Sequence, residues 1–149
     1  MKASRLIFTL LLASSVAVVQ LAAQQTKADQ KPIEEVKTKA EAGDAESEME
    51  LGRRYNKGEG VVKDQVEAAK WYRKAADQND ADAQYNLAIC YERGDGVAED
   101  WVEAYKWLLL AGRQGHEAPK EHMTLLESKL LTPEQLAQGQ KGAREFKPR

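Results

Sequence analysis

The sequence repeats itself at an offset of 36 residues. Residues 51–61, Leu-Gly-Arg-Arg-Tyr-Asn-Lys-Gly-Glu-Gly-Val, align with residues 87–97, Leu-Ala-Ile-Cys-Tyr-Glu-Arg-Gly-Asp-Gly-Val. Further matching residues extend the alignment: Asp64 and Asp100, Ala68 and Ala104, Lys70 and Lys106, Trp71 and Trp107, Ala75 and Ala111. A fixed period of this length is typical of a solenoid, in which each unit buries its apolar face against the next.

Each unit, at 44–79 and 80–115, predicts two helices joined by a loop with a Gly-x-Gly sequence. The first helix begins after Asp44 or Asp80, whose side chains can accept hydrogen bonds from the free backbone N–H groups of a helix start. Leucine and tyrosine four residues apart lie on one face of this helix, and the glycine that follows suits a left-handed helix end.

The second helix is expected to begin after Asp64 or Asp100. Each of these aspartates is followed three residues later by a glutamate, which is typical of a reciprocal capping box. Alanines and aromatic residues recur inside the helix at helical spacing, so Trp71 and Trp107 are predicted to fill equivalent core positions. Trp101 replaces a glutamine of the first unit, and it is either a partly exposed anchor or a wedge between units.

The flanking segments extend the array, and the whole is predicted to be all-α with about seven helices. Residues 32–43 have the pattern of a second helix without its partner, which makes a half repeat. Residues 116–149 are expected to form two capping helices, the second of which begins after Thr132 with a capping box and a proline in its first turn. Leu136 and Phe146 would then close the open end of the core.

The N-terminal residues have a different pattern. A short basic start precedes an uncharged apolar run at 6–19, and small residues around Ala23 offer a cleavage site, as in a secretory signal. An uncleaved membrane anchor is the alternative, but the run is shorter than the ~20 residues that a spanning helix needs. We therefore expect a signal peptide at 1–23, a polar linker at 24–31, a repeat domain at 32–149, and export to the bacterial periplasm or the exterior.

Charge and cysteine content restrict the possible functions. Removing Lys2 and Arg5 with the signal leaves 20 of the 22 basic residues against 24 acidic ones, a net charge of −4. No segment concentrates basic residues as a nucleic-acid surface does, so nucleic acid is not an expected partner. The single cysteine, Cys90, excludes an internal disulfide; we expect a buried, inert thiol, with pairing between chains as the alternative.

Motifs for metal binding or catalysis are missing from the sequence. His116 and His122 do not have metal-ligand spacing, and no acidic or cysteine cluster accompanies them. No nucleophile–base pattern or phosphate loop occurs either. The sequence therefore predicts no catalytic residue, no metal site and no cofactor.

The repeated motif resembles that of the Sel1-like repeat (SLR) family, relatives of the tetratricopeptide repeats. The shared pattern is Leu-Gly-x-x-Tyr-x-x-Gly-x-Gly-Val-x-x-Asp followed by Ala-x-x-Trp-Tyr-x-Lys-Ala-Ala, and it covers residues 44–115 closely. Ala88, Asn79 and the run Leu108-Leu109-Leu110 depart from it. The resemblance implies a right-handed α/α solenoid that is not an enzyme and acts as an adaptor or scaffold in protein complexes. Cleavage of the expected signal peptide would leave the chain without stable membrane insertion.

The resemblance also implies a binding surface for a protein or peptide, because the first helices of related solenoids line the concave face. Carry-over of those positions selects ten residues: Glu46, Met49, Arg53, Asn56, Lys57, Asp82, Tyr85, Ile89, Glu92 and Arg93. Tyr85 and Arg53 are the types most enriched at binding hot spots. The alternatives are a merely solvated face, a structural protein of the cell envelope, and an enzyme like the cysteine-rich relatives linked to β-lactam binding or hydrolysis, which carry paired cysteines in every repeat.

Overall fold

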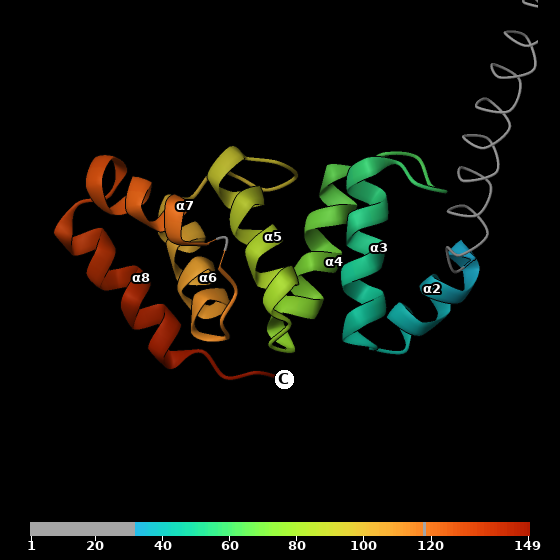
Figure 1. The fold of residues 1–149 in the computed structure, drawn as a ribbon. Coiled ribbons are helices and arrows are strands. Elements are labelled where there is room, and N and C mark those ends of the chain that lie inside the picture. The colour runs from blue at the N-terminus through green and yellow to red at the C-terminus, as the bar shows by residue number, and fades with distance from the viewer. Residues whose placement is uncertain (1–31, 118) are drawn as a thin grey trace, which may run out of the picture. The chain divides into compact units, whose positions relative to one another are not determined.

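The computed structural model describes residues 32–117 and 119–149. In these residues it contains seven α-helices, one π-helical turn and no strand, as the sequence predicts (Figure 1). The elements are α2 (Ile33–Glu41), α3 (Ala45–Lys57), α4 (Gln65–Asp77), α5 (Ala81–Arg93), α6 (Trp101–Arg113), α7 (Pro119–Leu125), η1 (Leu126–Leu130) and α8 (Pro133–Glu145). The predicted signal peptide and polar linker lie outside the described residues.

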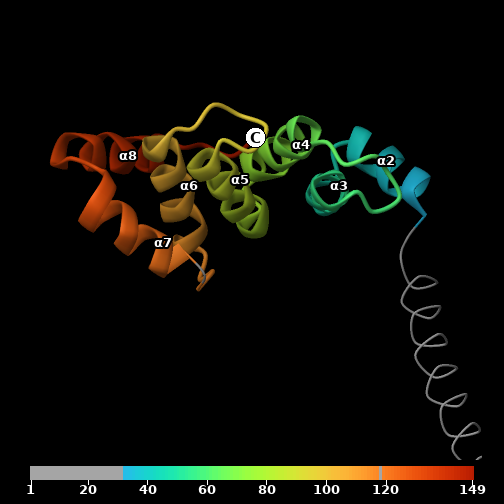
Figure 2. The same cartoon turned by 90° about the horizontal axis from the view of Figure 1, so that it is seen from above.

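The helices form two rows, which Figure 2 shows from above. The first-helix row consists of α3, α5 and α7, and the second-helix row consists of α2, α4, α6 and α8. Each helix from α2 to α7 packs on its neighbours in the sequence, and α8 packs on α6 within its own row. This alternation is the α/α solenoid that the 36-residue period predicts.

The predicted aspartate caps begin both first helices. Asp44 accepts a hydrogen bond from the backbone N–H of Ser47 at 3.0 Å, and Asp80 accepts one from that of Ala83 at 2.7 Å. Each of these satisfies a backbone donor that has no partner within the first turn. The caps thus fix where each repeat starts.

The second helices are capped in a simpler way than the sequence predicts. Asp64 accepts from two backbone N–H groups of its helix, and Asp100 does the same. The expected reciprocal bond from a glutamate is wrong, because the N–H groups of Asp64 and Asp100 donate instead to the carbonyl oxygens of Tyr55 and Tyr91 at 2.9 and 3.0 Å. A complete capping box does occur at Thr132, where α8 begins.

The predicted equivalence of the two repeated tryptophans is wrong. Trp107 is 1% exposed, covered by the ring of Phe146 with centroids 5.5 Å apart and by the guanidinium of Arg73 at 5.3 Å. Trp71 is only partly buried, against a smaller cluster formed with α2, and the ammonium of Lys74 lies 3.7 Å from its ring centroid. The two side chains differ because the C-terminal tail covers only the second of them.

The remaining core follows the repeat closely. Leu51 and Leu87 at equivalent positions are both fully buried. Trp101 is partly exposed and packs against the main core, which is compatible with either of its two predicted roles, and Leu136 of α8 packs there too. Cys90 is buried, and burial raises its pKa to about 11, so the thiol stays protonated and unreactive at neutral pH.

The chain after α8 turns back along the second-helix row (Figure 1). Phe146 packs on Trp107, and three residues later the backbone N–H of Arg149 donates to the carbonyl of Asp77 at 2.9 Å. The guanidinium of Arg149 also pairs with the Asp77 carboxylate at 2.9 Å. The tail therefore joins the C-terminal cap to the end of α4.

Candidate interaction surface

The ten residues predicted to bind a partner lie on α3 and α5 of the first-helix row. None of them is fully buried, so each offers at least part of its side chain to solvent. The exposed members are Glu46, Asn56, Lys57, Asp82 and Arg93, and the partly buried ones are Met49, Arg53, Tyr85, Ile89 and Glu92. We call this set the first-helix face.

Arg53 is held by carboxylates of its own repeat. Its Nε and Nη2 donate to the two oxygens of Glu50 at 2.7 and 2.8 Å, and its Nη1 donates to Glu59 at 2.5 Å. Arg54 adds a further bond to Glu50 at 2.7 Å. The hydrogen bonds from Arg53 are the main reason that the pKa of Glu50 falls to about 2. The guanidinium group of Arg53 is therefore already engaged in hydrogen bonds within the chain.

Tyr85 lies in a cluster with two histidines from the segment that leads into α7 and from α7 itself. Its ring stacks on that of His116 with centroids 4.9 Å apart, and its hydroxyl lies 3.3 Å from Nε2 of His122. Nδ1 of His122 lies 2.8 Å from a carboxylate oxygen of Glu92, and Nε2 of His116 lies 3.1 Å from one of Asp82. The structure thus brings together three predicted residues of α5.

The hydrogen-bond roles in this cluster follow from the chemistry of each group. The carboxylate of Glu92 only accepts, so Nδ1 of His122 donates to it. In the neutral ring Nε2 then accepts from the hydroxyl of Tyr85. Both histidines therefore act in docking α7 against α5, a role that the sequence analysis did not assign to them.

Two hollows border the cluster. One of about 520 Å³ is lined by Tyr85, Glu117, Lys120, Glu121 and His122. The other, of about 290 Å³, lies between α6 and α7 and has a mainly apolar lining, with Leu109, Pro119 and Met123 among its residues. The junction of α5, α6 and α7 therefore combines apolar, aromatic and charged groups, the mixture that protein interfaces use.

The repeat register adds a residue that the prediction missed. Counting 36 residues on from Arg53 and Ile89 leads to Leu125, which is 38% exposed on α7. The carry-over stopped at residue 115 because the third copy lacks the tyrosine and the Gly-x-Gly sequence. The period itself would have found Leu125.

The described residues of this region form no metal-binding group. In the described residues no three histidine, cysteine, aspartate or glutamate side chains are placed to hold a metal ion. The histidines of the Tyr85 cluster are engaged by one carboxylate each. Within the same residues, no helix is both long and apolar enough to span a bilayer.

Comparison with known proteins identifies the repeat. Residues 45–80 and 81–116 match the Sel1 repeat. A Sel1 repeat protein from Oxalobacter formigenes has a crystal structure that is 38% identical to this chain, covering 60% of this chain and 67% of that one, with a TM-score of 0.59. The chain belongs to the Sel1 repeat family.

Two longer proteins share the repeat with this Sel1 repeat chain. The crystal structure of a protective antigen of uropathogenic Escherichia coli with an SLR fold is 30% identical over 85% of this chain, with a TM-score of 0.74. The secretory immunoglobulin A-binding protein EsiB of Escherichia coli O6:H1 (strain CFT073) is 44% identical over 43 residues, which is 29% of this chain. The chain spans only 28% of the antigen and 9% of EsiB.

Proposed function

We propose that this chain is an exported adaptor or scaffold that binds a protein partner through its first-helix face, extended to Leu125. It catalyses no reaction in this role. Membership of the Sel1 repeat family supports the proposal, since these repeats serve as protein-binding modules. The relative named for binding secretory immunoglobulin A supports an extracytoplasmic protein as the partner.

The observation that carries the proposal is the pair of aliphatic side chains at one repeat position. Ile89 is partly exposed and lies outside the buried core clusters, and Leu125 is exposed on the next helix of the same row. Tyr85 and His122 of the Tyr85 cluster lie on these same two helices. An apolar centre with a polar surround is the usual anatomy of a binding hot spot.

A pair of matched double variants tests the proposal. Ile89→Ser with Leu125→Ser should reduce partner affinity about tenfold or more, because truncating a hot spot costs ~2 kcal/mol or more. Val62→Ser with Val66→Ser makes the same chemical change near the start of α4, where both valines are exposed, and should leave affinity unchanged. Partners would be crosslinked and captured from cell-envelope extract and identified, and secretory immunoglobulin A would serve as one defined bait.

These positions are better suited to the test than Arg53 and Tyr85. Both of those side chains make intramolecular hydrogen bonds, so their removal would mix a loss of stability with a loss of binding. Equal capture by wild type and the Ile89/Leu125 variant would contradict the proposal. If only the Val62/Val66 variant fails to capture a partner, the binding site lies on the second-helix row instead. If the chain sediments with the cell envelope but captures no partner, the result supports a structural role in the envelope.

A further inference from the structure

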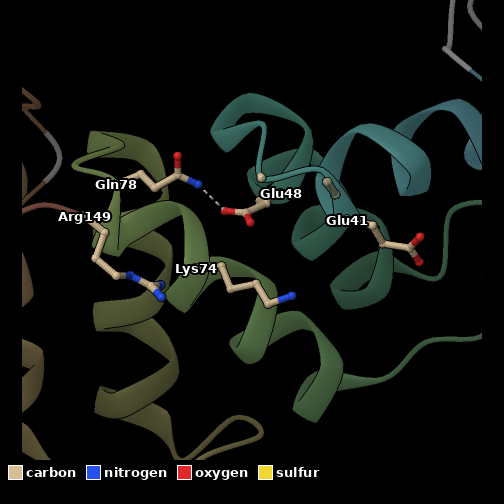
Figure 3. Close-up of a pocket in the computed structure, with 7 residues that line it drawn as sticks. Glu41, Glu48, Lys74, Gln78 and Arg149 are labelled. Atoms are coloured by element: carbon tan, nitrogen blue, oxygen red, sulfur yellow. Dashed lines mark hydrogen bonds between the residues drawn. The ribbon is translucent and has the colours of Figure 1, made fainter.

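A hollow of about 320 Å³ opens where the loop after α2 meets α3 and the end of α4. Figure 3 shows its charged side chains, with Glu48 between Gln78 and Lys74. The lining residues are Ala40, Glu41, Gly43, Glu48, Lys74, Gln78 and Arg149. None of them belongs to the first-helix face, so the hollow is a separate feature of the molecule.

Glu48 is the buried group of this hollow. It is 4% exposed, and one of its carboxylate oxygens accepts a hydrogen bond from Nε2 of Gln78 at 2.7 Å (Figure 3). Among the described residues no cation lies within ion-pair distance of it. Burial raises the pKa of the carboxyl above its usual value, and this effect outweighs the lowering by the Gln78 hydrogen bond and by the more distant charges of Lys74 and Arg149. A buried carboxylate without a cationic partner is costly, so this site favours an occupant that supplies one.

The second repeat contains the same site in a filled form. Gln84 takes the place of Glu48, and Gln114 donates to its Oε1 at 2.9 Å, as Gln78 does in the first repeat. The side-chain amide nitrogen of Gln84 then donates to the carbonyl of Ala76 at 3.3 Å and to the side chain of Asn79 at 3.2 Å. An N–H donor and the asparagine side chain thus occupy this position in the second repeat.

The first repeat lacks both of these groups. Ala40 and Gly43 are the counterparts of Ala76 and Asn79, and both line the hollow. Glu48 has an acceptor oxygen where Gln84 has an N–H donor, so it cannot bond to the Ala40 carbonyl. Gly43 contributes no side chain, which leaves the volume of an asparagine side chain open. The Ala40 carbonyl accepts from the backbone N–H of Gly43 at 3.0 Å, but it lacks the second, side-chain donor that its counterpart Ala76 has.

The cations that line the hollow are held by other groups. The ammonium of Lys74 lies over the ring of Trp71 at 3.7 Å, and the guanidinium of Arg149 pairs with Asp77 at 2.9 Å. Glu41 adds a second carboxylate at the rim, and it is exposed. The unmet requirement of the site is a positively charged N–H donor of small size.

We propose that this hollow binds a primary alkylammonium group, which donates to Glu48 and to the Ala40 carbonyl as the amide of Gln84 does in the second repeat. The group could be the end of a lysine side chain of a partner or a free alkylamine, and the same contacts would hold both. Its three donors match the charge and the hydrogen-bonding deficit of the site.

Nuclear magnetic resonance titration tests the proposal with defined probes. n-Butylammonium and N-acetyl-lysine methylamide should shift the signals of the Gln78 side-chain amide and the Gly43 backbone amide saturably, and the uncharged N-acetyl-norleucine methylamide should not. Glu48→Gln should weaken the binding of both cations tenfold or more, whereas Glu34→Gln makes the same charge change at an exposed position of α2 and should have no effect. Tighter binding of the lysine derivative than of n-butylammonium identifies a protein side chain as the source, and tighter binding of n-butylammonium identifies a free amine.

A second variant rebuilds the filled site of the other repeat. Gly43→Asn with Glu48→Gln should abolish binding and raise the midpoint of thermal unfolding above that of wild type. The asparagine fits because φ at Gly43 is 90°, Asn79 adopts 70° at the counterpart, and a Cβ at Gly43 meets nothing within 4 Å. No saturable binding to wild type, equal binding of the norleucine derivative, or an unchanged affinity in Glu48→Gln would each overturn the proposal.

Discussion

At the scale of single residues, Trp107 and Trp71 make different contributions to stability. Replacing the buried Trp107 by Ala removes its contacts with Phe146 and Arg73 and should cost roughly 3–5 kcal/mol of unfolding free energy. Trp71→Ala should cost less than half of that, because the side chain is partly exposed. Urea unfolding of both variants, followed by circular dichroism, measures the two losses.

The indole N–H of Trp71 leads to a second prediction at this site. It is buried and has no hydrogen-bond partner among the described residues, which costs free energy in the folded state. Trp71→Phe keeps most of the ring and removes this donor, so it should leave stability nearly unchanged. Equal losses for Trp71→Ala and Trp107→Ala would show that the two sites are equivalent after all.

The repeat pattern predicts the residue type at a position but not what covers it. The aspartate caps at Asp44 and Asp80 depend on the neighbouring backbone alone, and they are confirmed. Trp71 is partly exposed because no described residue covers it as Phe146 covers Trp107. One of the hydrogen bonds of Arg53 depends on Glu59, which lies in the loop after α3. Contacts of this kind come from outside the motif, so the motif does not encode them.

At the scale of elements, the two repeat loops impose unequal demands on glycine. Gly60 and Gly96 both have φ of 74°. A Cβ at Gly96 would lie 2.0 Å from the carbonyl oxygen of Gln65 at the start of α4, whereas one at Gly60 would meet only Ile33, at 3.8 Å. The second loop therefore rests directly on the backbone of the first repeat.

Alanine at these two glycines should separate backbone strain from close packing. Gly60→Ala should cost about 1–2 kcal/mol, the usual penalty of the left-handed conformation. Gly96→Ala should cost at least ~3 kcal/mol, because the α4 backbone must also move. Chemical denaturation measures both, and equal losses would mean that the loop moves away from α4 without cost.

The sequence predicts only part of the candidate surface, namely the part that α3 and α5 contribute. The sequence predicts α3 and α5 and the face that each offers, because the repeat fixes their registers. It did not predict that α7 contributes His122 and Leu125 to the same region, because the third copy keeps the period but loses the motif. A search by period would extend further along a divergent array than a search by motif.

At the scale of the whole molecule, the prediction concerns export. The apolar run at 6–19 and the small residues near Ala23 predict that the exported protein begins near Gln24. N-terminal sequencing of the extracytoplasmic fraction measures this. Leu11→Arg with Leu12→Arg should keep the chain in the cytosol, because a charged run is a poor signal core. An intact Met1 on a wild-type cytosolic pool would contradict the prediction.

The tail that joins Phe146 and Arg149 to Trp107 and Asp77 changes how the array unfolds. In an ideal solenoid each repeat contacts only its immediate neighbours. Its stability is then a sum of repeat and nearest-neighbour terms, and the two ends can unfold independently of each other. Here a contact between residues 72 positions apart couples the C-terminal cap to the first repeat. Loss of the cap therefore also weakens the far repeat, and this coupling favours cooperative melting of an array as short as this one.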